Sequence, residues 1–275
     1  MSQNGQSARS KENVLRRHYW SPRREGIRFV DEESFLYPFC LTMESGFWSD
    51  LHSHEDFGEI FYASSGCSVL CVEQGNLACD SRRAIWIPPG VSHEWYTASE
   101  IHNRAVFVHS SAVAGRERFN SLHMIEVTPL LRELILSAAE NTPDFSSDKG
   151  RRLGLVLLDS FEDAPLASSS LVMPRAHQLV EMCARAMLNP EEPISFDDWS
   201  EKLHISSKTL ARMFNRETGQ TMGQWVQLMR LLHARHCIDG GQSITEAALE
   251  SGYSSVSAFI HAFRKRFGFT PGSTR

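Results

Sequence analysis

The sequence has few cysteines, no paired cysteine motif and no long apolar run. Its 275 residues include six cysteines. These are scattered and form no Cys-x-x-Cys pair, so we expect free thiols in a reducing cytoplasm rather than a disulfide framework. No stretch approaches the roughly 18–20 consecutive apolar residues that a membrane helix needs. The polar first eleven residues also lack the apolar core of a secretory signal. The sequence therefore predicts a cytoplasmic protein with no membrane partner.

Neither charge sign dominates the chain, whose formal net charge is −5. Apolar residues make up 41% and charged residues 22%, which excludes a wholly disordered or fibrous protein. The charge is unevenly divided: residues 173–275 carry 12 Lys and Arg against 10 Asp and Glu, whereas residues 1–172 carry 16 against 23. A mildly basic C-terminal third permits a nucleic-acid-binding face.

The hydrophobic pattern changes along the chain and predicts an α+β protein of two domains. Short apolar runs separated by turns predict a β-sandwich or barrel in the first half. Helical periodicity then takes over and, after a Ser-rich break, continues to the C-terminus. The expected segments are a polar tail (1–34), a β-rich domain (35–127), a helical segment (128–161), a linker (162–172) and an all-α domain (173–275).

The helical segment has a well-defined predicted start. Thr128 can cap the first helix, and Pro129 suits the first helical position because its missing N–H has no partner there in any helix. A second helix is expected from about residue 148 to 161. Four leucines suggest that these helices mediate dimerisation, or alternatively that they only cover the β domain; they are Leu130, Leu134, Leu155 and Leu158.

The all-α domain contains two predicted helix-turn-helix units 48 residues apart. In the first, Ser195 begins a short helix, and a second helix runs from about Ser206 to Gly219, which can adopt the left-handed cap. In the second, Ser243 and Glu246 form a capping box, and the following helix begins near Ser254 or Ser255. An amphipathic helix over 222–238 joins the units. Such a spacer can hold two reading helices about 34 Å apart, one turn of DNA.

This region resembles the DNA-binding domain of AraC/XylS-type transcription regulators. The matching residues include Ser206, Leu210, Arg212, Phe214, Gly219, Arg230, Ala234, Ile244, Glu246, Ala248, Gly252, Phe259, Phe263, Gly268, Pro271 and Arg275. Ala247 and Thr274 depart from the family pattern. The resemblance implies double-stranded DNA as a partner, read by Lys208, Ala211 and Arg212 in the first unit. Val256, Ser257, His261 and Arg264 would make the DNA contacts of the second. Because Val256 and Ser257 are short, the second unit would contact thymine methyl groups or anchor mainly to phosphates.

The β-rich domain carries a candidate metal-ligand set. His52 and His54 are two residues apart and would share one face of a strand, and a further His and a carboxylate from neighbouring strands could complete the site. Imidazole and carboxylate ligands suit Zn, Ni, Mn or Fe(II). The residues Gly46, His52, His54, Glu59 and Gly66 form one motif, and Pro88, Gly90 and His93 form a second. Their spacings resemble the two motifs of the cupin superfamily, with Arg82 and Thr97 as departures. The resemblance implies a cupin-like β-barrel with the ligands His52, His54, Glu59 and His93.

An organic effector is the alternative occupant of this domain, with the histidines hydrogen-bonding it or one another. The aromatic residues Trp48, Phe61, Trp86 and Trp95 are candidates for the pocket wall, or else belong to the core. The sequence thus predicts a non-enzymatic, DNA-binding regulator that senses a metal ion or small molecule. We expect the protein to be a homodimer. If it is an activator, it would also contact RNA polymerase. The alternative is a metal-dependent cupin enzyme, of the oxygenase or isomerase type, fused to a helical DNA-binding module.

Overall fold

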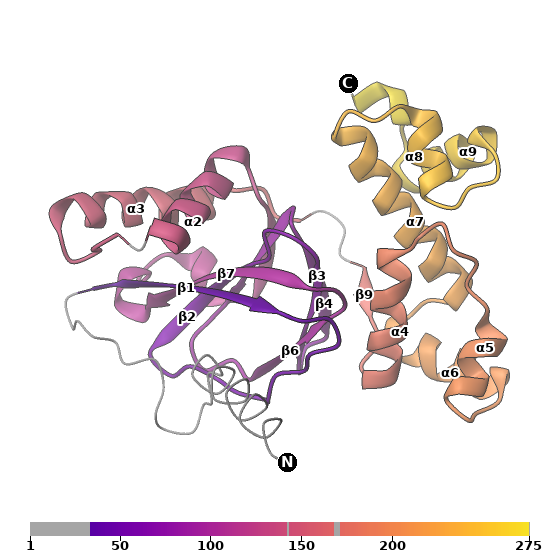
Figure 1. Cartoon of the computed structure of the whole chain (residues 1–275), viewed down its shortest axis with the longest axis horizontal. Helices are drawn as coiled ribbons and strands as arrows, with labels where there is room; N and C mark the ends of the chain where they lie inside the picture. The colour runs from indigo at the N-terminus through magenta and orange to yellow at the C-terminus, as the bar shows by residue number, and fades with distance from the viewer. Residues whose placement is uncertain (1–33, 142, 168–170, 275) are drawn as a thin grey trace, which may run out of the picture. The chain divides into compact units, whose positions relative to one another are not determined.

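The computed structural model describes residues 34–141, 143–167 and 171–274 (Figure 1). Within them, one compact unit comprises 34–73 and 79–167, and a second comprises 74–78 and 171–274. The first is built on β-sheets and the second on helices, so the predicted α+β class with a β-rich unit before a helical one is confirmed. The predicted polar tail, apart from Ser34, lies outside the described residues.

The first unit contains antiparallel sheets. A five-stranded sheet has the order β1 (Leu36–Met43), β7 (Ile101–His109), β2 (Phe57–Tyr62), β5 (Arg83–Ile87) and β8 (His123–Glu126). In the other sheet, β3 (Cys67–Val72) pairs with β6 (His93–Thr97). Short 3₁₀ turns, Ser110–Ala112 and Glu117–Asn120, precede β8.

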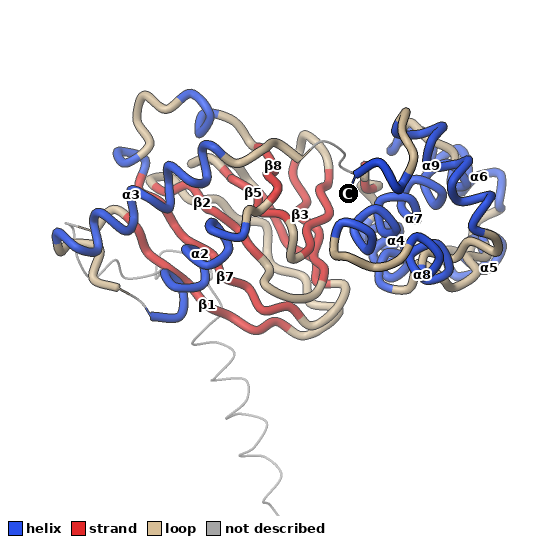
Figure 2. The backbone as a smooth tube through the Cα atoms, turned by 90° about the horizontal axis from the view of Figure 1, so that it is seen from above, coloured by secondary structure: helices blue, strands red, loops and turns tan. Residues whose placement is uncertain are grey.

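The register of the five-stranded sheet divides its residues between two faces. Ile60 lies opposite Trp86, and Glu59 lies opposite Ile87. Since successive side chains on a strand point to opposite sides, Ile60 and Trp86 share one face and Glu59 takes the other. Helices α2 (Pro129–Asn141) and α3 (Asp148–Asp163) cover the first of these faces (Figure 2). The core there includes Leu36, Ile60, Tyr62, Trp86, Val106, Phe119, Leu131, Ile135, Leu157, Leu158 and Phe161.

The two predicted helices of this segment are confirmed, together with the cap of the first. The hydroxyl of Thr128 accepts a hydrogen bond from the backbone N–H of Leu131 at 3.2 Å. The second helix extends to Asp163, two residues beyond the expected end, which shortens the predicted linker. Leu158 is fully buried in the core, so it is not available for dimerisation, whereas Leu130 is 62% exposed and Leu155 37% exposed.

Six α-helices make up most of the second unit. They are α4 (His177–Leu188), α5 (Phe196–Lys202), α6 (Ser207–Thr218), α7 (Met222–Asp239), α8 (Ile244–Glu250) and α9 (Val256–Phe267), followed by a 3₁₀ turn at Pro271–Thr274. We call α5 with α6 the first helix pair, and α8 with α9 the second helix pair. In the part of the chain that the structure describes, no helix combines the length and apolar character needed to span a bilayer.

The local signals read from the sequence place these helix ends correctly. Ser206 caps α6 by accepting the N–H of Thr209, and Gly219 ends that helix at a φ of 70°. The capping box of Ser243 and Glu246 is present at the start of α8. Each cap uses groups within three or four residues of one another, which is why sequence alone can predict it.

The start of the second unit is held by side chains from two of its helices. The short strand β9 (Val172–Met173) pairs with the first residues of β4 (Asn76–Asp80). The indole N–H of Trp225, on α7, donates to the carbonyl of Val172 at 2.8 Å. The carboxylate of Glu217, at the end of α6, accepts the backbone N–H groups of Arg175 at 2.9 Å and Ala176 at 3.2 Å. The segment from Val172 to Ala176, which leads into α4, is therefore tied directly to α6 and α7.

Candidate metal centre and nucleic-acid interface

The four predicted metal ligands come together on the face of the sheet opposite the helices. Glu59 extends from β2, and His93 begins β6. His52 and His54 do not lie on a strand as expected, but on the loop between β1 and β2; of these two histidines, only His52 forms a bridge, with His93. Reciprocal backbone hydrogen bonds of 2.9 and 2.8 Å between His52 and His93 fix this loop against β6.

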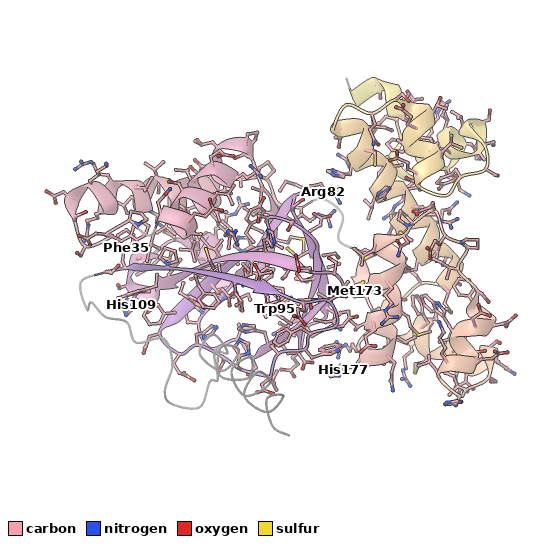
Figure 3. All side chains as sticks on the ribbon, viewed as in Figure 1. Phe35, Arg82, Trp95, His109, Met173 and His177 are labelled. Atoms are coloured by element: carbon pink, nitrogen blue, oxygen red, sulfur yellow. The ribbon has the colours of Figure 1, made fainter. Side chains whose placement is uncertain are left out.

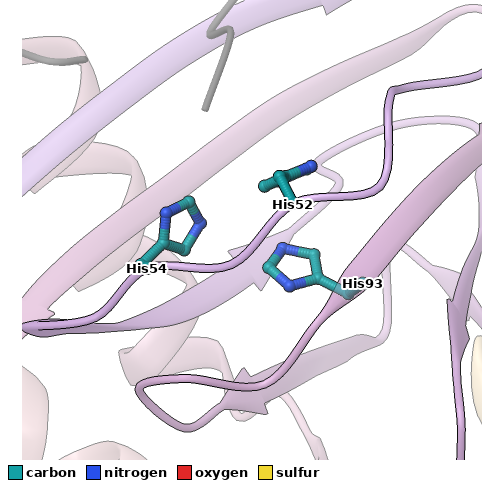
Figure 4. Close-up of side chains that lie close together, drawn as sticks. All are labelled: His52, His54 and His93. Carbon is teal, nitrogen blue, oxygen red and sulfur yellow. The ribbon is translucent and has the colours of Figure 1, made fainter. Parts of the chain in front are cut away.

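The imidazole rings converge. One ligand atom from each of His52, His54 and His93 lies within 4.8 Å of the others (Figure 4). The Nε2 atoms of His54 and His93 are each 3.5 Å from Oε2 of Glu59. In two of the rings the other nitrogen is engaged: Nδ1–H of His52 donates to the Asp50 carbonyl at 2.6 Å, and Nδ1–H of His93 donates to the Val91 carbonyl at 2.9 Å. This tautomer leaves Nε2 as a ligand atom, which is the usual arrangement of metal-binding histidines.

The buried carboxylate of Glu59 and the imidazole of His52 have strongly shifted pKa values. Burial alone would raise the pKa of Glu59, but its interactions with His54 and His93 outweigh burial and lower the pKa to about 2. Burial and the neighbouring His93 lower the pKa of His52 to about 4. At neutral pH the site therefore holds an ionised carboxylate beside an uncharged His52. A cation bound here would lie beside this buried carboxylate and would stabilise its charge.

These pKa values predict how acid affects the metal-free protein. Unfolded, His52 binds a proton below about pH 6.5, whereas folded it does so only below about pH 4. Between these values the unfolded state holds more protons, so the free energy of unfolding should fall as the pH falls through this window. Urea unfolding in EDTA at several pH values should show a shallower decline for His52→Gln than for the wild type. An equal decline in both would contradict the assignment, and His102→Gln, a half-exposed histidine paired with Glu100, is the control.

Only two of the four expected pocket aromatics lie on the same face as the cluster. Phe61 of β2 and Trp95 of β6 stack at 3.5 Å between ring centroids, with an interplanar angle of 20°. Of the two, Trp95 is labelled in Figure 3. Trp86 faces the helices instead, and its indole N–H donates to the Phe119 carbonyl at 2.7 Å. Trp48 bridges Tyr96, the neighbour of Trp95 that points to the other side of β6, and their rings are 4.8 Å apart.

Sequence reasoning did not identify some of the groups around the cluster. The ring of Phe107, on β7, lies 5.1 Å from that of His54 and closes one side of the site. The carbonyls of Asp50 and Val91 orient two of the histidines, as described above. Phe107 lies in an expected strand, but only the register opposite Glu59 places it here. Backbone carbonyls carry no residue-specific signal at all.

A second candidate site lies on the exposed side of α6. Lys208, Ala211 and Arg212 are all exposed, as the sequence predicts, while Leu210 and Phe214 are fully buried on the opposite side. The ring of Phe214 packs edge-on against Trp225 of α7, at 6.0 Å. This anchor leaves two cationic side chains on a solvent-exposed helix face, where a recognition helix contacts bases and phosphates.

The equivalent side of α9 agrees with the sequence prediction except at one residue. Ser257, His261 and Arg264 are exposed, whereas Val256 is partly buried and packs against the core of the second helix pair. Lys265 and Arg266 are exposed as well and extend the basic character of this helix. Both candidate reading helices therefore present cations to solvent. On α9 the cations Arg264, Lys265 and Arg266 lie near the end of the helix.

Comparison with known proteins agrees with this architecture. A family model described as a helix-turn-helix domain matches residues 199–275. The HTH-type transcriptional regulator NimR of Escherichia coli K12 is 31% identical over 228 residues, which cover 82% of this chain and 81% of that protein. The HTH-type transcriptional activator RhaR of the same organism is 22% identical over 169 residues, 60% of each chain.

Among solved structures, ToxT from Vibrio cholerae O395 matches 87% of this chain and 96% of that chain, with 12% identity and a TM-score of 0.36. An identity and a TM-score this low support no argument about function. The match to NimR does, because it runs at 31% identity through most of both chains and includes both units. The chain belongs to the AraC/XylS family of transcriptional regulators.

Proposed function

We propose that this regulator reads a specific DNA sequence with two helix-turn-helix units and that its first unit, a cupin-like barrel, senses a metal ion. The α5–α6 and α8–α9 pairs form the two units, and α6 and α9 are their reading helices. The exposure of Lys208 and Arg212 opposite a buried Leu210 and Phe214 supports this assignment. Because its proposed target is double-stranded DNA, we place the protein in the cytoplasm.

The observation that carries the sensory proposal is the buried set of three histidines and one carboxylate. His52, His54, His93 and Glu59 would hold a divalent ion such as Zn, Ni, Mn or Fe(II), since imidazole and carboxylate suit these metals. The ion would supply positive charge beside Glu59 and a Lewis-acid centre for an oxygen- or nitrogen-bearing effector. Phe61 and Trp95 would form the apolar wall on which such an effector rests.

Control of transcription would follow from a shift between two conformations of the protein. A metal or effector can bias such an equilibrium only if it binds the two conformations with different affinity. The loop that carries His52 and His54 is a suitable element, because ligation at Nε2 would fix its position against β6. If the protein activates transcription, RNA polymerase would be its partner at the promoter.

The experiment that tests the DNA-reading function is selection of binding sites. The full-length protein, purified with and without added Zn²⁺, is incubated with a library of random duplexes, and bound duplexes are amplified and sequenced. Enrichment of one sequence containing two conserved segments about one helical turn apart would support the proposal. Recovery of unrelated sequences under both conditions would contradict it.

Dimerisation through α2 and α3 is part of the proposal. Leu130 and Leu155 expose apolar surface on these helices, and a second copy of the chain could cover it. We expect the double variant Leu130→Glu, Leu155→Glu to sediment as a monomer while the wild type sediments as a dimer. Leu249→Glu, which alters a leucine 55% exposed on α8, is the matched control and should remain dimeric. A monomeric wild type would instead indicate that these leucines only cover the sheet.

A further inference from the structure

One arginine in the middle of α7 joins two separate parts of the helical unit. Arg230 donates three hydrogen bonds, all to backbone carbonyls: Nε to Pro190 at 2.8 Å, Nη2 to Glu192 at 3.0 Å and Nη1 to Gly252 at 3.3 Å. Pro190 and Glu192 lie in the loop that leads into the first helix pair, and Gly252 lies in the turn of the second. The planar guanidinium thus connects the two halves by a fork of fixed geometry.

The glycine at the far end of this contact is required by space as well as by backbone conformation. Gly252 has a φ of 77°, and a Cβ built there would lie 2.7 Å from the Pro190 carbonyl oxygen and 2.9 Å from Cζ of Arg230. Gly219 and Gly268 have similar positive φ values of 70° and 83°, yet a Cβ at either would meet no atom within 4 Å. Gly252 therefore permits the close approach of the loop, the arginine and the turn.

Arg230 lies in the middle of α7, the helix that runs from the first helix pair to the second (Figure 1). Before it, Trp225 packs against Phe214 of the first helix pair. After it, Leu231, Ala234 and Ile238 enter the core formed with α8 and α9. A helix fixes the distance between two groups along its axis, but a shared helix by itself leaves each half free to tilt about the junction. A side contact at the junction restrains that tilt.

We propose that Arg230 and Gly252 form a clasp that fixes the orientation of the second helix pair relative to the first, and so sets the spacing between the two DNA segments that α6 and α9 contact. Arg230 is a positioning residue in this proposal and touches no base. The inference rests on the proposed reading of DNA by both helix pairs. A single inserted base pair moves one segment by about 3.4 Å and rotates it by about 35°, so a rigid reader is sensitive to spacing.

The test measures affinity as a function of spacing. The probe is the duplex selected by the wild-type protein, together with versions carrying one base pair more or one fewer between its two conserved segments. We expect each change to weaken wild-type binding about tenfold or more. For Arg230→Gln we expect binding to the original duplex about tenfold weaker. We also expect the spacing penalty, which is the loss of affinity on adding or removing one base pair, to be below about threefold, because the loosened halves adapt to either spacing.

Two further variants separate geometry from charge and from folding. Arg230→Lys keeps the positive charge but not the three-donor fork, so it should lose the spacing penalty as Arg230→Gln does. Gly252→Ala disturbs the same contact from the other side and should act in the same direction. Arg235→Lys is the control, because Arg235 lies on the same helix and pairs with Asp239 instead. Thermal unfolding followed by circular dichroism checks that each variant is folded.

The outcomes distinguish the clasp from the function on which it rests. A folded Arg230 variant that keeps the full wild-type spacing penalty would overturn the clasp while leaving DNA reading intact. The clasp would also be overturned if the wild-type protein selects a sequence but binds equally well when the spacing changes. Two reading helices held in a fixed orientation should lose affinity when the spacing changes. Failure of the wild type to select any sequence would overturn the proposed function and the clasp together.

Discussion

Arg212→Ala should weaken binding to the selected duplex about 5- to 150-fold, the equivalent of about 1–3 kcal/mol for one specific base contact. Arg212 is exposed on α6, one turn after Lys208, and its neighbours Leu210 and Phe214 hold the helix in place from the opposite side. Truncating it removes a guanidinium from the exposed side of α6 without opening a cavity. Fluorescence anisotropy at one fixed salt concentration measures the effect, since affinity for DNA varies steeply with salt.

The sequence dependence of the loss separates a base contact from a phosphate contact. If Arg212 reads a base, the loss should be large on the selected duplex and small on an unrelated duplex. If it contacts a phosphate, both duplexes should lose affinity equally and the salt dependence should become shallower. Arg235→Ala on α7, where the side chain is paired with Asp239, should leave both affinities near the wild-type values. Wild-type affinity in Arg212→Ala would refute the assignment of α6 as a reading helix.

The second large effect concerns the histidine cluster. Purified wild-type protein should retain about one divalent metal ion per chain after dialysis, whereas His52→Ala, His54→Ala should retain almost none, because two of four ligands are gone. Elemental analysis by mass spectrometry identifies the ion and its amount. Saturation at about 100 times the dissociation constant should also stabilise the wild type by about 2.7 kcal/mol in unfolding experiments, and the double variant by nothing measurable.

The matched control for this measurement is His102→Ala. His102 pairs with Glu100 at 3.7 Å and its side chain is 45% exposed, so removing it should not alter metal content. Equal and negligible metal in the wild type, the double variant and the control would exclude resident metal. In that case the cluster would hold an organic effector through hydrogen bonds from its imidazoles, and the stack of Phe61 on Trp95 would gain importance.

Much of the helical unit could be predicted from sequence because its signals are local. Ser206, Gly219 and the capping box of Ser243 with Glu246 each act within one helical turn, so their residue types and spacing suffice. The proximity of His52, His54, Glu59 and His93 is not local, and it was accessible only through the resemblance to cupin motifs. The structure brings all four together, although the loop around His52 is not the strand that the spacing suggested.

What sequence reasoning missed depends on register and on backbone groups. A shift of one residue along a strand moves a side chain to the other face, so the assignment of Trp86 to the pocket could not be checked before the pairing of Ile60 with Trp86 was known. Arg230 belongs to the family pattern, but its partners are three carbonyls from segments about 20 and 40 positions away. No side-chain pattern marks such acceptors, because every residue has one.

The attachment of the chain at the start of the helical unit has a mechanical consequence. Trp225 holds the carbonyl of Val172, and Glu217 holds the N–H groups of Arg175 and Ala176. Tension applied to the polypeptide at these points therefore reaches the end of α6 and the start of α7 directly, and not only α4, which follows them in sequence. Such tension would act on α6, a candidate reading helix, and on α7, the helix that connects the first helix pair to the second.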